Sequence, residues 1–371
     1  MRIALLAHLR FPIAEPFKGG MEAFVWHLAQ GLAERGHSVD LLASGDSGGA
    51  ARLVPVRPEH YEPTIPWQRW HGTDRLNDWL DAAYGDALGL LERGGYDVVH
   101  NNSLHRYPPR WARHTRTPMV SSMHVPPFGP LRRAVHDAPA PWNLTTVTSE
   151  TQAARWWPEG RPATGRVVHN GIDPSRWPFS PQGNGVAVWA GRITHLKAPD
   201  HAARAARAAG VPLTVFGAIE DRDWFDAELR PLLGDGVRYG GHLSGGELAE
   251  ELGRASAFLF TPLWDEPFGL AAIEAMACGT SVAGYASGAV AEVVGDGGRL
   301  ARPEDEAGLA RALREALEMD RRVPRRRVEE AFTLERMIDR FEALYAEAAD
   351  ARDTPAPSVS YEAYELPLQT S

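Results

Sequence analysis

Cysteine and lysine are nearly missing from this sequence. Among its 371 residues there is one cysteine, Cys278, which excludes an internal disulfide and fits a reducing compartment. Because Cys278 lies in an apolar helical stretch, a small packing residue is favoured over a reactive thiol. The only lysines are Lys18 and Lys197, so arginine supplies nearly every positive charge.

Long hydrophobic runs are also missing. No apolar stretch approaches the length of a membrane-spanning helix. The short apolar run at residues 3–7 fits a buried strand better than a secretory signal. We therefore expect a cytoplasmic protein without a membrane span, and peripheral contact with a membrane stays open.

The charge balance excludes one class of partner. The chain carries 39 Lys and Arg against 48 Asp and Glu, a net charge of −9, which argues against nucleic-acid binding through a broad basic surface. The composition, 44% hydrophobic and 23% charged, is that of an ordinary globular protein, and the length predicts two to three domains.

Two groups of cofactor motifs are missing as well. There is no GxGxxG at a strand-to-helix junction, and no His/Cys cluster has metal-ligand spacing. We therefore expect no dinucleotide cofactor and no metal.

What is present is an alternation of strands and helices in two halves, which predicts an α/β fold with parallel sheets covered on both faces. In the first half we expect a helix at 21–35 and strands at 2–8, 38–43, 97–100, 118–123 and 145–148. In the second half we expect strands at 186–190, 213–217 and 257–261, with helices at 199–209, 247–254, 304–319 and 323–349.

A stretch rich in Pro and Gly, residues 174–185, separates the two halves and is interpreted as a linker. The predicted domains are residues 1–173 and 186–330, each Rossmann-like and doubly wound, with a ligand cleft between them. Residues 351–371 are interpreted as a mobile tail rather than a partner-binding segment.

The most informative segment, residues 265–280, reads DEPFGLAAIEAMACGT. Glu266 lies in a Pro/Gly turn, and Glu274 lies eight positions later in an Ala/Leu/Met-rich helix that Gly279 ends. A helix N-terminus attracts phosphate, and a carboxylate accepts hydrogen bonds from hydroxyl groups. The two side by side therefore suit a nucleotide sugar.

This segment resembles the signature of retaining glycosyltransferases of family 4, which have the GT-B fold. The resemblance implies that Glu266 bonds the donor sugar, helped by the backbone N–H groups of Phe268, Gly269 and Leu270. It implies that Glu274 holds the ribose. It also implies that a last helix, 331–350, completes the N-terminal domain.

Other segments extend the resemblance over both halves. Gly191 to Lys197 is similar to the family's G-R-x-x-x-x-K-G, which implies that Arg192 and Lys197 hold the donor diphosphate, with Ala198 in place of the usual Gly. The paired Gly19-Gly20 resembles the G-G-x-E loop that approaches the diphosphate, and the Gly240-Gly241-His242-Leu243 turn resembles the one beside the nucleobase. The segment Asn170-Gly171-Ile172-Asp173 resembles the N-G-I-D that precedes the linker.

Several residues keep two interpretations. His124 resembles the family histidine beside the transferred sugar, but it can also be structural, which is the favoured interpretation for His8 and His100. Asp221-Arg222-Asp223 spells the D-x-D of metal-dependent glycosyltransferases of another fold, yet helix capping is favoured here. In a Pro-rich loop, 57–74, aromatic residues either bind an acceptor or pack the loop; they are Tyr61, Trp67 and Trp70.

The sequence therefore predicts a retaining, metal-independent glycosyltransferase of the hexosyltransferase type. Its donor would be a nucleoside diphosphate sugar, with uridine the base most frequent in the family. Its acceptor would be a small molecule such as a natural-product core, and the oligomeric state stays open. Alternatives are a nucleotide-sugar epimerase or hydrolase on the same fold, transfer to a lipid-linked acceptor, and a binding protein without activity.

Overall fold

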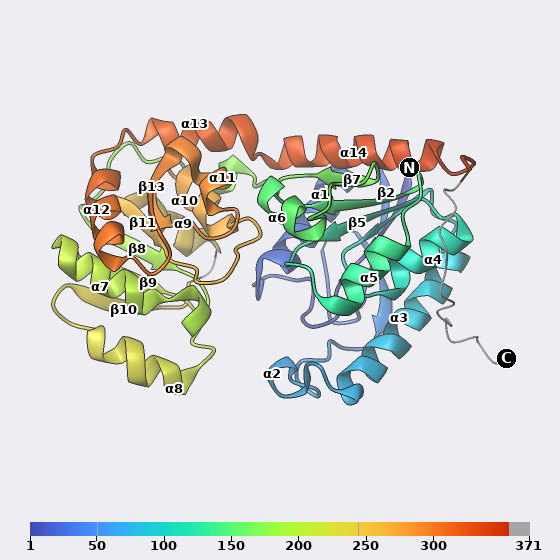
Figure 1. Ribbon diagram of the computed structural model, residues 1–371, viewed down its shortest axis with the longest axis horizontal. Helices are drawn as coiled ribbons and strands as arrows, with labels where there is room; N and C mark the ends of the chain where they lie inside the picture. The colour runs from blue at the N-terminus through green and yellow to red at the C-terminus, as the bar shows by residue number, and fades with distance from the viewer. Residues whose placement is uncertain (50, 244, 356–371) are drawn as a thin grey trace. The chain divides into compact units, whose positions relative to one another are not determined.

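The computed structural model of the chain describes residues 1–49, 51–243 and 245–355, and Figure 1 shows its elements in chain order. The chain divides into two units. Unit 1 comprises residues 1–148, 153–168 and the chain from Ile338 onward, and unit 2 comprises 149–152 and 169–337. The linker predicted at 174–185 lies within unit 2, where Pro174–Arg176 form a short 3-10 turn. Of the tail predicted at 351–371, residues 356–371 lie outside the described residues.

Unit 1 is built on a parallel seven-stranded sheet in the order β3-β2-β1-β4-β5-β6-β7. The strand order changes direction at β1, as in a doubly wound fold. Its strands are β1 Arg2–Leu6, β2 Ser38–Ser44, β3 Arg52–Arg57, β4 Val98–Asn101, β5 Met119–Met123, β6 Asn143–Val147 and β7 Gly165–Val167.

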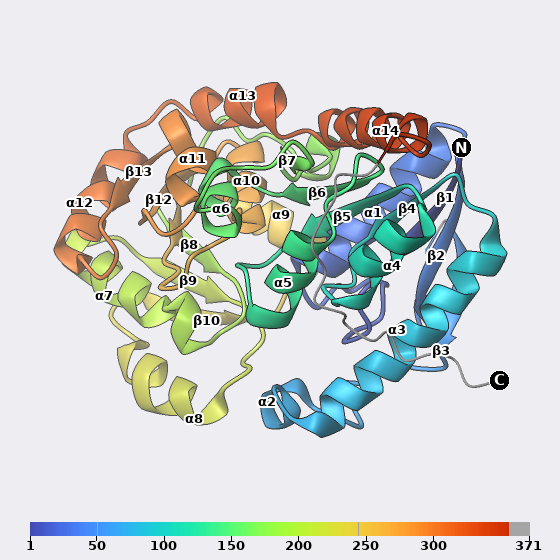
Figure 2. The same ribbon diagram turned by 45° about the vertical axis from the view of Figure 1, so that its right-hand side comes forward.

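Helices cover both faces of this sheet, and Figure 2 shows α3, α4 and α5 following one another along one side. On the other side α14 lies along α1, where the Arg35 guanidinium bonds Asp339 at 2.5 Å and Glu342 at 2.6 Å. The helices of this unit are α1 Gly20–Glu34, α2 Trp67–Trp70, α3 Asp74–Gly94, α4 Tyr107–Thr115 and α5 Gly129–Asp137. Two more, α6 Glu150–Trp156 and α14 Leu334–Asp350, cross the boundary of the units, and most of each belongs to unit 1.

Unit 2 has a parallel six-stranded sheet in the order β10-β9-β8-β11-β12-β13, which again changes direction at its first strand. The predicted α/β fold with two Rossmann-like domains is therefore confirmed. The strands are β8 Ala187–Ala190, β9 Leu213–Phe216, β10 Val237–Gly241, β11 Ala257–Phe260, β12 Ser281–Tyr285 and β13 Gly298–Ala301. The helices are α7 Pro199–Ala209, α8 Arg222–Trp224, α9 Gly245–Arg254, α10 Leu270–Ala277, α11 Val290–Val294, α12 Glu306–Leu317 and α13 Arg322–Ala331.

The continuous helix predicted at 323–349 is wrong. The structure breaks it into α13 and α14 because the backbone around Thr333 pairs with Ile172 instead of continuing the helix. The Ile172 N–H donates to Phe332 O at 3.0 Å, and the Leu334 N–H donates to Ile172 O at 2.8 Å. The hydroxyl of Thr333 then accepts the Arg336 N–H at 3.3 Å, as an N-cap does.

Two partly buried arginines hold the helices of unit 2 together. The Arg321 guanidinium donates to carbonyl oxygens of Gly253, Ala255 and Cys278, which follow or end α9 and α10. The Arg325 guanidinium donates to Ala277 O at 2.7 Å. These bonds satisfy carbonyls that a helix C-terminus leaves without partners.

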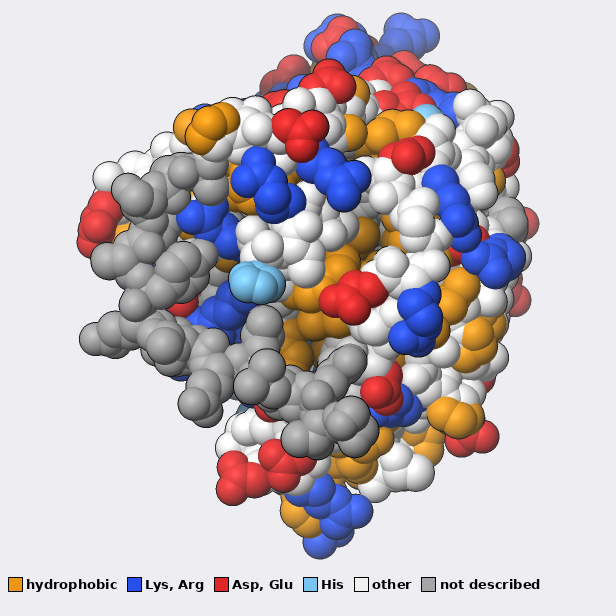
Figure 3. Space-filling model, turned by 90° about the vertical axis from the view of Figure 1, so that its right-hand side faces the viewer, with side chains coloured by type: hydrophobic (Ala, Val, Ile, Leu, Met, Phe, Trp, Pro, Cys, Tyr) orange, Lys and Arg blue, Asp and Glu red, His pale blue; other side chains and the backbone are white. Residues whose placement is uncertain are grey.

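On the face of the molecule shown in Figure 3, basic and acidic side chains are interspersed rather than sorted by sign.

No helix of the described residues combines the length and the apolar character needed to cross a membrane.

Candidate functional site

The helix α10 carries the motif that the sequence singled out. It begins after Gly269, whose backbone is left-handed at φ 103°, a conformation that favours glycine. It ends in a Schellman motif: the Gly279 N–H donates to Met276 O at 2.9 Å, and the Thr280 N–H donates to Ala275 O at 3.0 Å. The predicted end at Gly279 is thus confirmed.

Glu266 is buried, with 9% of the residue exposed, and two side chains bond its carboxylate. Its Oε2 accepts hydrogen bonds from Lys197 Nζ at 2.7 Å and from Trp264 Nε1 at 2.9 Å. The ammonium of Lys197 also lies 5.0 Å from the centre of the Trp264 ring. Two residues predicted on separate motifs are therefore brought together, and Trp264 is a partner that the sequence analysis did not identify.

The loop that carries Lys197 is tied to the end of β11. The hydroxyl of Thr261 donates to Lys197 O and Ala198 O at 2.9 and 2.8 Å, and it accepts the Trp189 Nε1–H at 3.0 Å. Ala198 is left-handed at φ 46°, which explains why the family usually has glycine at this position. The loop after β8 and the loop after β11 both lie at carboxyl ends of parallel strands, where such sheets bind ligands.

Arg192 lies in the same loop as Lys197 but is more exposed. Its Nη1 donates to both oxygens of Glu220, at 3.1 and 3.2 Å, and 47% of its side chain is exposed. A surface ion pair of this kind contributes little to stability, so an anionic ligand can replace Glu220 at small cost.

Glu274, the second carboxylate, has a different environment from Glu266. It lies in the middle of α10, partly buried, and no described residue gives its carboxylate a hydrogen bond or an ion pair. Burial without a partner raises the pKa of Glu274 to about 7. A hydroxyl donor, or a proton, would relieve this unpaired charge.

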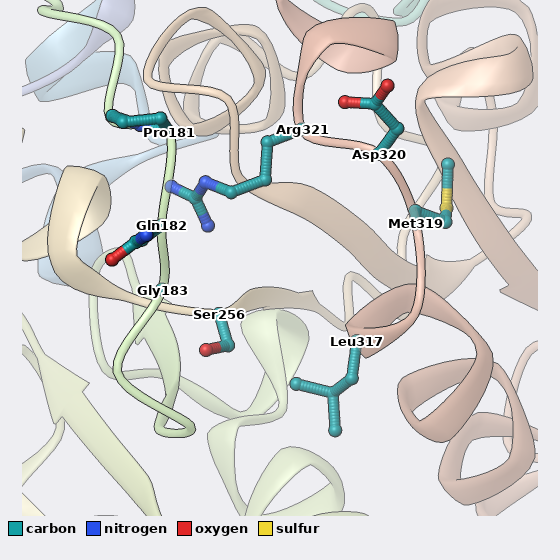
Figure 4. Close-up of a pocket in the computed structure, with 8 residues that line it drawn as sticks. All are labelled: Pro181, Gln182, Gly183, Ser256, Leu317, Met319, Asp320 and Arg321. Carbon is teal, nitrogen blue, oxygen red and sulfur yellow. The ribbon is translucent and has the colours of Figure 1, made fainter.

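The remaining predicted residues of unit 2 follow β10 or begin α10. His242 is exposed and Leu243 packs partly against the core. Phe268 is buried in that core, beside the turn that leads into α10. A separate hollow has a volume of about 410 Å³, and Figure 4 shows the residues that line it, among them Ser256 and Arg321. Because Ser256 precedes β11, this hollow is at the amino edge of the sheet, away from the predicted site.

In unit 1 the predicted residues lie at the carboxyl ends of β1, β4 and β5 and at the start of α1. Gly19 is the N-cap of α1 and has an extended backbone, so its turn does not require glycine. A Cβ at Gly19 would instead lie 3.1 Å from Glu22 Oε2. Glu22 is buried and lies 2.9 Å from His8 Nε2, so the start of α1 already has a carboxylate close by.

His124 directly follows β5 and is partly buried. Its Nε2 lies 2.9 Å from Asn102 Oδ1, and its ring meets Phe24 edge-on at 4.5 Å. Burial, with a contribution from His8, lowers the pKa of His124 to about 3. By contrast His100 is fully buried between Tyr345 and Ser122, which supports the structural interpretation favoured for it.

The aromatic residues of the predicted loop divide into buried and exposed. Tyr61 is 5% exposed and packs in the core, which agrees with its packing interpretation. Trp67 and Trp70 bound the short helix α2, and Trp67 is 40% exposed with His71 stacked on it at 4.4 Å. An acceptor contact at Trp67 or Trp70 stays a prediction.

The D-x-D segment is a helix cap, as favoured. The Asp221 carboxylate accepts the Trp224 N–H at 3.0 Å at the start of α8. Within the described residues no group of three or more His, Cys, Asp and Glu side chains could hold a metal ion.

Known proteins match the chain over both units. Residues 18–176 match the family model described as Glycosyltransferase Family 4, and residues 176–333 match the one described as glycosyl transferases group 1. A glycogen synthase of Mycobacterium tuberculosis is 31% identical over 347 residues, which span 81% of this chain and 83% of the relative. The chain is a GT-B glycosyltransferase of the family 4 kind.

Two further comparisons give the range of this glycosyltransferase family. A D-inositol 3-phosphate glycosyltransferase of Mycolicibacterium smegmatis is 27% identical over 86% of this chain and 84% of its own length. The crystal structure of Anabaena Alr3699/HepE in complex with UDP and glucose covers 93% of this chain and 99% of its own, with a TM-score of 0.67 and 18% identity. The structural likeness supports the fold, and the two curated relatives carry names for two different activities.

Proposed function

We propose that this glycosyltransferase moves a sugar from a UDP-sugar to a hydroxyl of a small acceptor, with retention of configuration and without a required metal. The observation that carries the proposal is the cluster of Lys197, Glu266 and Trp264 beside the start of α10. It combines a cation, a hydrogen-bond-accepting carboxylate and free helix N–H groups at the carboxyl edge of a parallel sheet.

The roles follow from the charges. Arg192 and Lys197 would offset the negative charge that develops on the departing diphosphate, which fixed cations can do without proton transfer. Glu266 would accept hydrogen bonds from sugar hydroxyls, with the N–H groups of Phe268, Gly269 and Leu270 beside it. In unit 1, Gly19 and Gly20 at the start of α1 would approach the diphosphate.

The base, the ribose and the sugar each have a candidate contact. Glu274, which has no partner among the described residues, would receive the ribose hydroxyls, and the His242-Leu243 turn would lie beside the base. His124 would contact the transferred sugar. A uridine base is supported by the UDP bound to Anabaena Alr3699/HepE, and a small polar acceptor by the inositol phosphate named for the relative of M. smegmatis.

The test incubates the protein with a panel of nucleoside diphosphate sugars and candidate acceptors, in the presence of EDTA, and measures released nucleotide and coupled product. We expect one UDP-sugar to be consumed only with acceptor, and the anomeric proton of the product to show the donor's configuration. Lys197→Ala and Glu266→Ala should lose this activity, whereas Lys18→Ala, the other lysine, should keep most of it.

Three results would overturn the proposal. Consumption of donor without acceptor would identify a hydrolase or epimerase. Inversion at the anomeric carbon would exclude retention, and full activity of Lys197→Ala would remove the assigned site.

A further inference from the structure

The end of β4 holds a buried asparagine that the proposed reaction does not use. Asn102 is fully buried, and its backbone N–H donates to Leu6 O at 2.7 Å, which fixes it beside the end of β1. Its side-chain oxygen Oδ1 lies 2.9 Å from Nε2 of His124, at the end of the neighbouring strand β5. The two residues therefore form one polar contact at the carboxyl edge of the unit 1 sheet.

The orientation of the Asn102 amide follows from its other contact. The amide nitrogen Nδ2 faces the carbonyl oxygen of His100 at 3.5 Å, and a carbonyl oxygen can only accept a hydrogen bond. Turning the amide over would place oxygen against oxygen at His100 and N–H against the ring of His124. The oxygen of Asn102 therefore faces His124, and it accepts a hydrogen bond from the Nε2–H group.

The protonation of His124 follows in turn. A neutral imidazole carries one proton, and if that proton is on Nε2, then Nδ1 is an acceptor. No described residue forms a hydrogen bond to Nδ1 of His124. The titratable groups around the ring are His8 after β1, Glu22 in α1 and His100 in β4. Burial and His8 disfavour the imidazolium of His124, and Glu22 favours it.

We propose that Asn102 is a positioning residue that fixes His124 in the Nε2–H tautomer, so that Nδ1 is presented as a hydrogen-bond acceptor to a hydroxyl of the sugar substrate. The contact to the sugar rests on the proposed function, whereas the tautomer does not. His124 then neither donates nor removes a proton in the reaction. It selects a substrate that has a hydroxyl group at the contacted carbon.

The tautomer is tested on the whole protein labelled with ¹⁵N-histidine. Ring-nitrogen correlation spectra distinguish Nε2–H from Nδ1–H, and the signal missing in His124→Gln identifies His124. We expect the wild-type ring to be the Nε2–H tautomer from pH 5 to 8, and Asn102→Leu to change its ring-nitrogen shifts. An Nδ1–H tautomer in the wild type, or a spectrum unchanged in Asn102→Leu, would overturn the proposal, whether or not turnover is found.

Activity tests the consequence for the substrate. Loss of one positioning hydrogen bond in Asn102→Leu should lower kcat/KM about three- to tenfold. In Asn102→Asp a carboxylate faces the ring and favours the imidazolium, so Nδ1 becomes a donor when pH falls. We expect kcat/KM of this variant to decline on the acidic side with a midpoint between about pH 5 and 8, where the wild type has no such limb.

Asn101 supplies the matched control. It is the adjacent buried asparagine. Its amide donates to the Ser121 hydroxyl at 3.1 Å and accepts the Ser103 N–H at 3.1 Å, and no described histidine forms a hydrogen bond to its side chain. Asn101→Leu should lose stability as Asn102→Leu does, without moving the His124 signals or adding an acidic limb. If Asn101→Leu reproduced both effects, they would be structural and the positioning role would be refuted.

Discussion

The carboxyl group of Glu274 can be tested by removing its charge in Glu274→Gln. Burial raises its pKa from the ordinary 4.5 to about 7, and no described residue stabilises the ionised form. One pKa unit corresponds to about 1.4 kcal/mol, so ionisation of Glu274 costs the folded protein up to about 3 kcal/mol above pH 7. Because the group is only partly buried, solvent screening reduces the observable effect to about 1–3 kcal/mol.

The sign of the pH dependence follows from a raised pKa. Below the pKa of the unfolded state, near 4.5, Glu274 is protonated in both states, and its full contribution to the free energy of unfolding is present. This contribution is lost as pH rises through about 7, the pKa in the folded protein. Glutamine has nearly the same shape and no charge to desolvate. We therefore expect Glu274→Gln to be similar to the wild type at pH 5 and more stable at pH 8.5, by about 1–3 kcal/mol.

The assay is urea unfolding followed by tryptophan fluorescence at both pH values, with Glu292→Gln as the matched control of opposite sign. Burial alone would raise the pKa of Glu292, but bonds from His169 and from the N–H groups of Glu150 and Thr151 outweigh it and lower the pKa to about 2. Stability from Glu292 is present above pH 4.5 and lost as pH falls towards 2, so its Gln variant should be less stable than the wild type at pH 8.5. A stability difference for Glu274→Gln that is the same at pH 5 and pH 8.5 would refute the reasoning.

Two further predictions concern the loop after β8. In Lys197→Met the buried carboxylate of Glu266 keeps its bond from Trp264 but loses its cation. We therefore expect loss of transfer activity and about 1–3 kcal/mol of destabilisation in urea unfolding. Unchanged stability would contradict the importance of the 2.7 Å pair between Lys197 and Glu266. Ala198→Gly relieves a left-handed backbone at φ 46°, and we expect about 0.5–1 kcal/mol of stabilisation after the entropy cost of glycine, with lower stability in the same assay as the contrary result.

Much of this fold follows from local patterns in the sequence. Most central strands were predicted within one or two residues because they are continuous buried runs, as at Ala257–Phe260, but the equally buried central strand β12, Ser281–Tyr285, was not identified. Edge strands were not identified: β3, Arg52–Arg57, has an alternating and partly exposed pattern with a proline in it. The break at Thr333 was also out of reach, because its cause is a pairing with Ile172, more than 160 positions earlier in the chain.

The site shows the same division. Glu266, Lys197 and His124 could be singled out because short motifs carry them, but a motif does not give a partner. That Lys197 bonds Glu266, or that Asn102 faces His124, depends on which loops meet at the carboxyl edge of a sheet. The sequence did contain one signal for Asn102. Asn101 ends a buried strand and Asn102 follows it, which is where polar side chains of α/β proteins contact ligands.

The two glutamates of the motif have contrasting environments, although they are only eight positions apart in the sequence. Glu266 has a cation and an indole N–H on one oxygen, so its carboxylate is already bonded by two side chains. Burial raises the pKa of Glu274 to about 7 and no described residue bonds its carboxylate, so its ionised form is costly until a ligand supplies hydroxyl donors. Binding of the ribose would then lower the pKa of Glu274, and by linkage donor affinity should rise as pH increases through 7. A donor affinity that is independent of pH from 6 to 8.5 in the wild type would show that Glu274 does not receive the ribose.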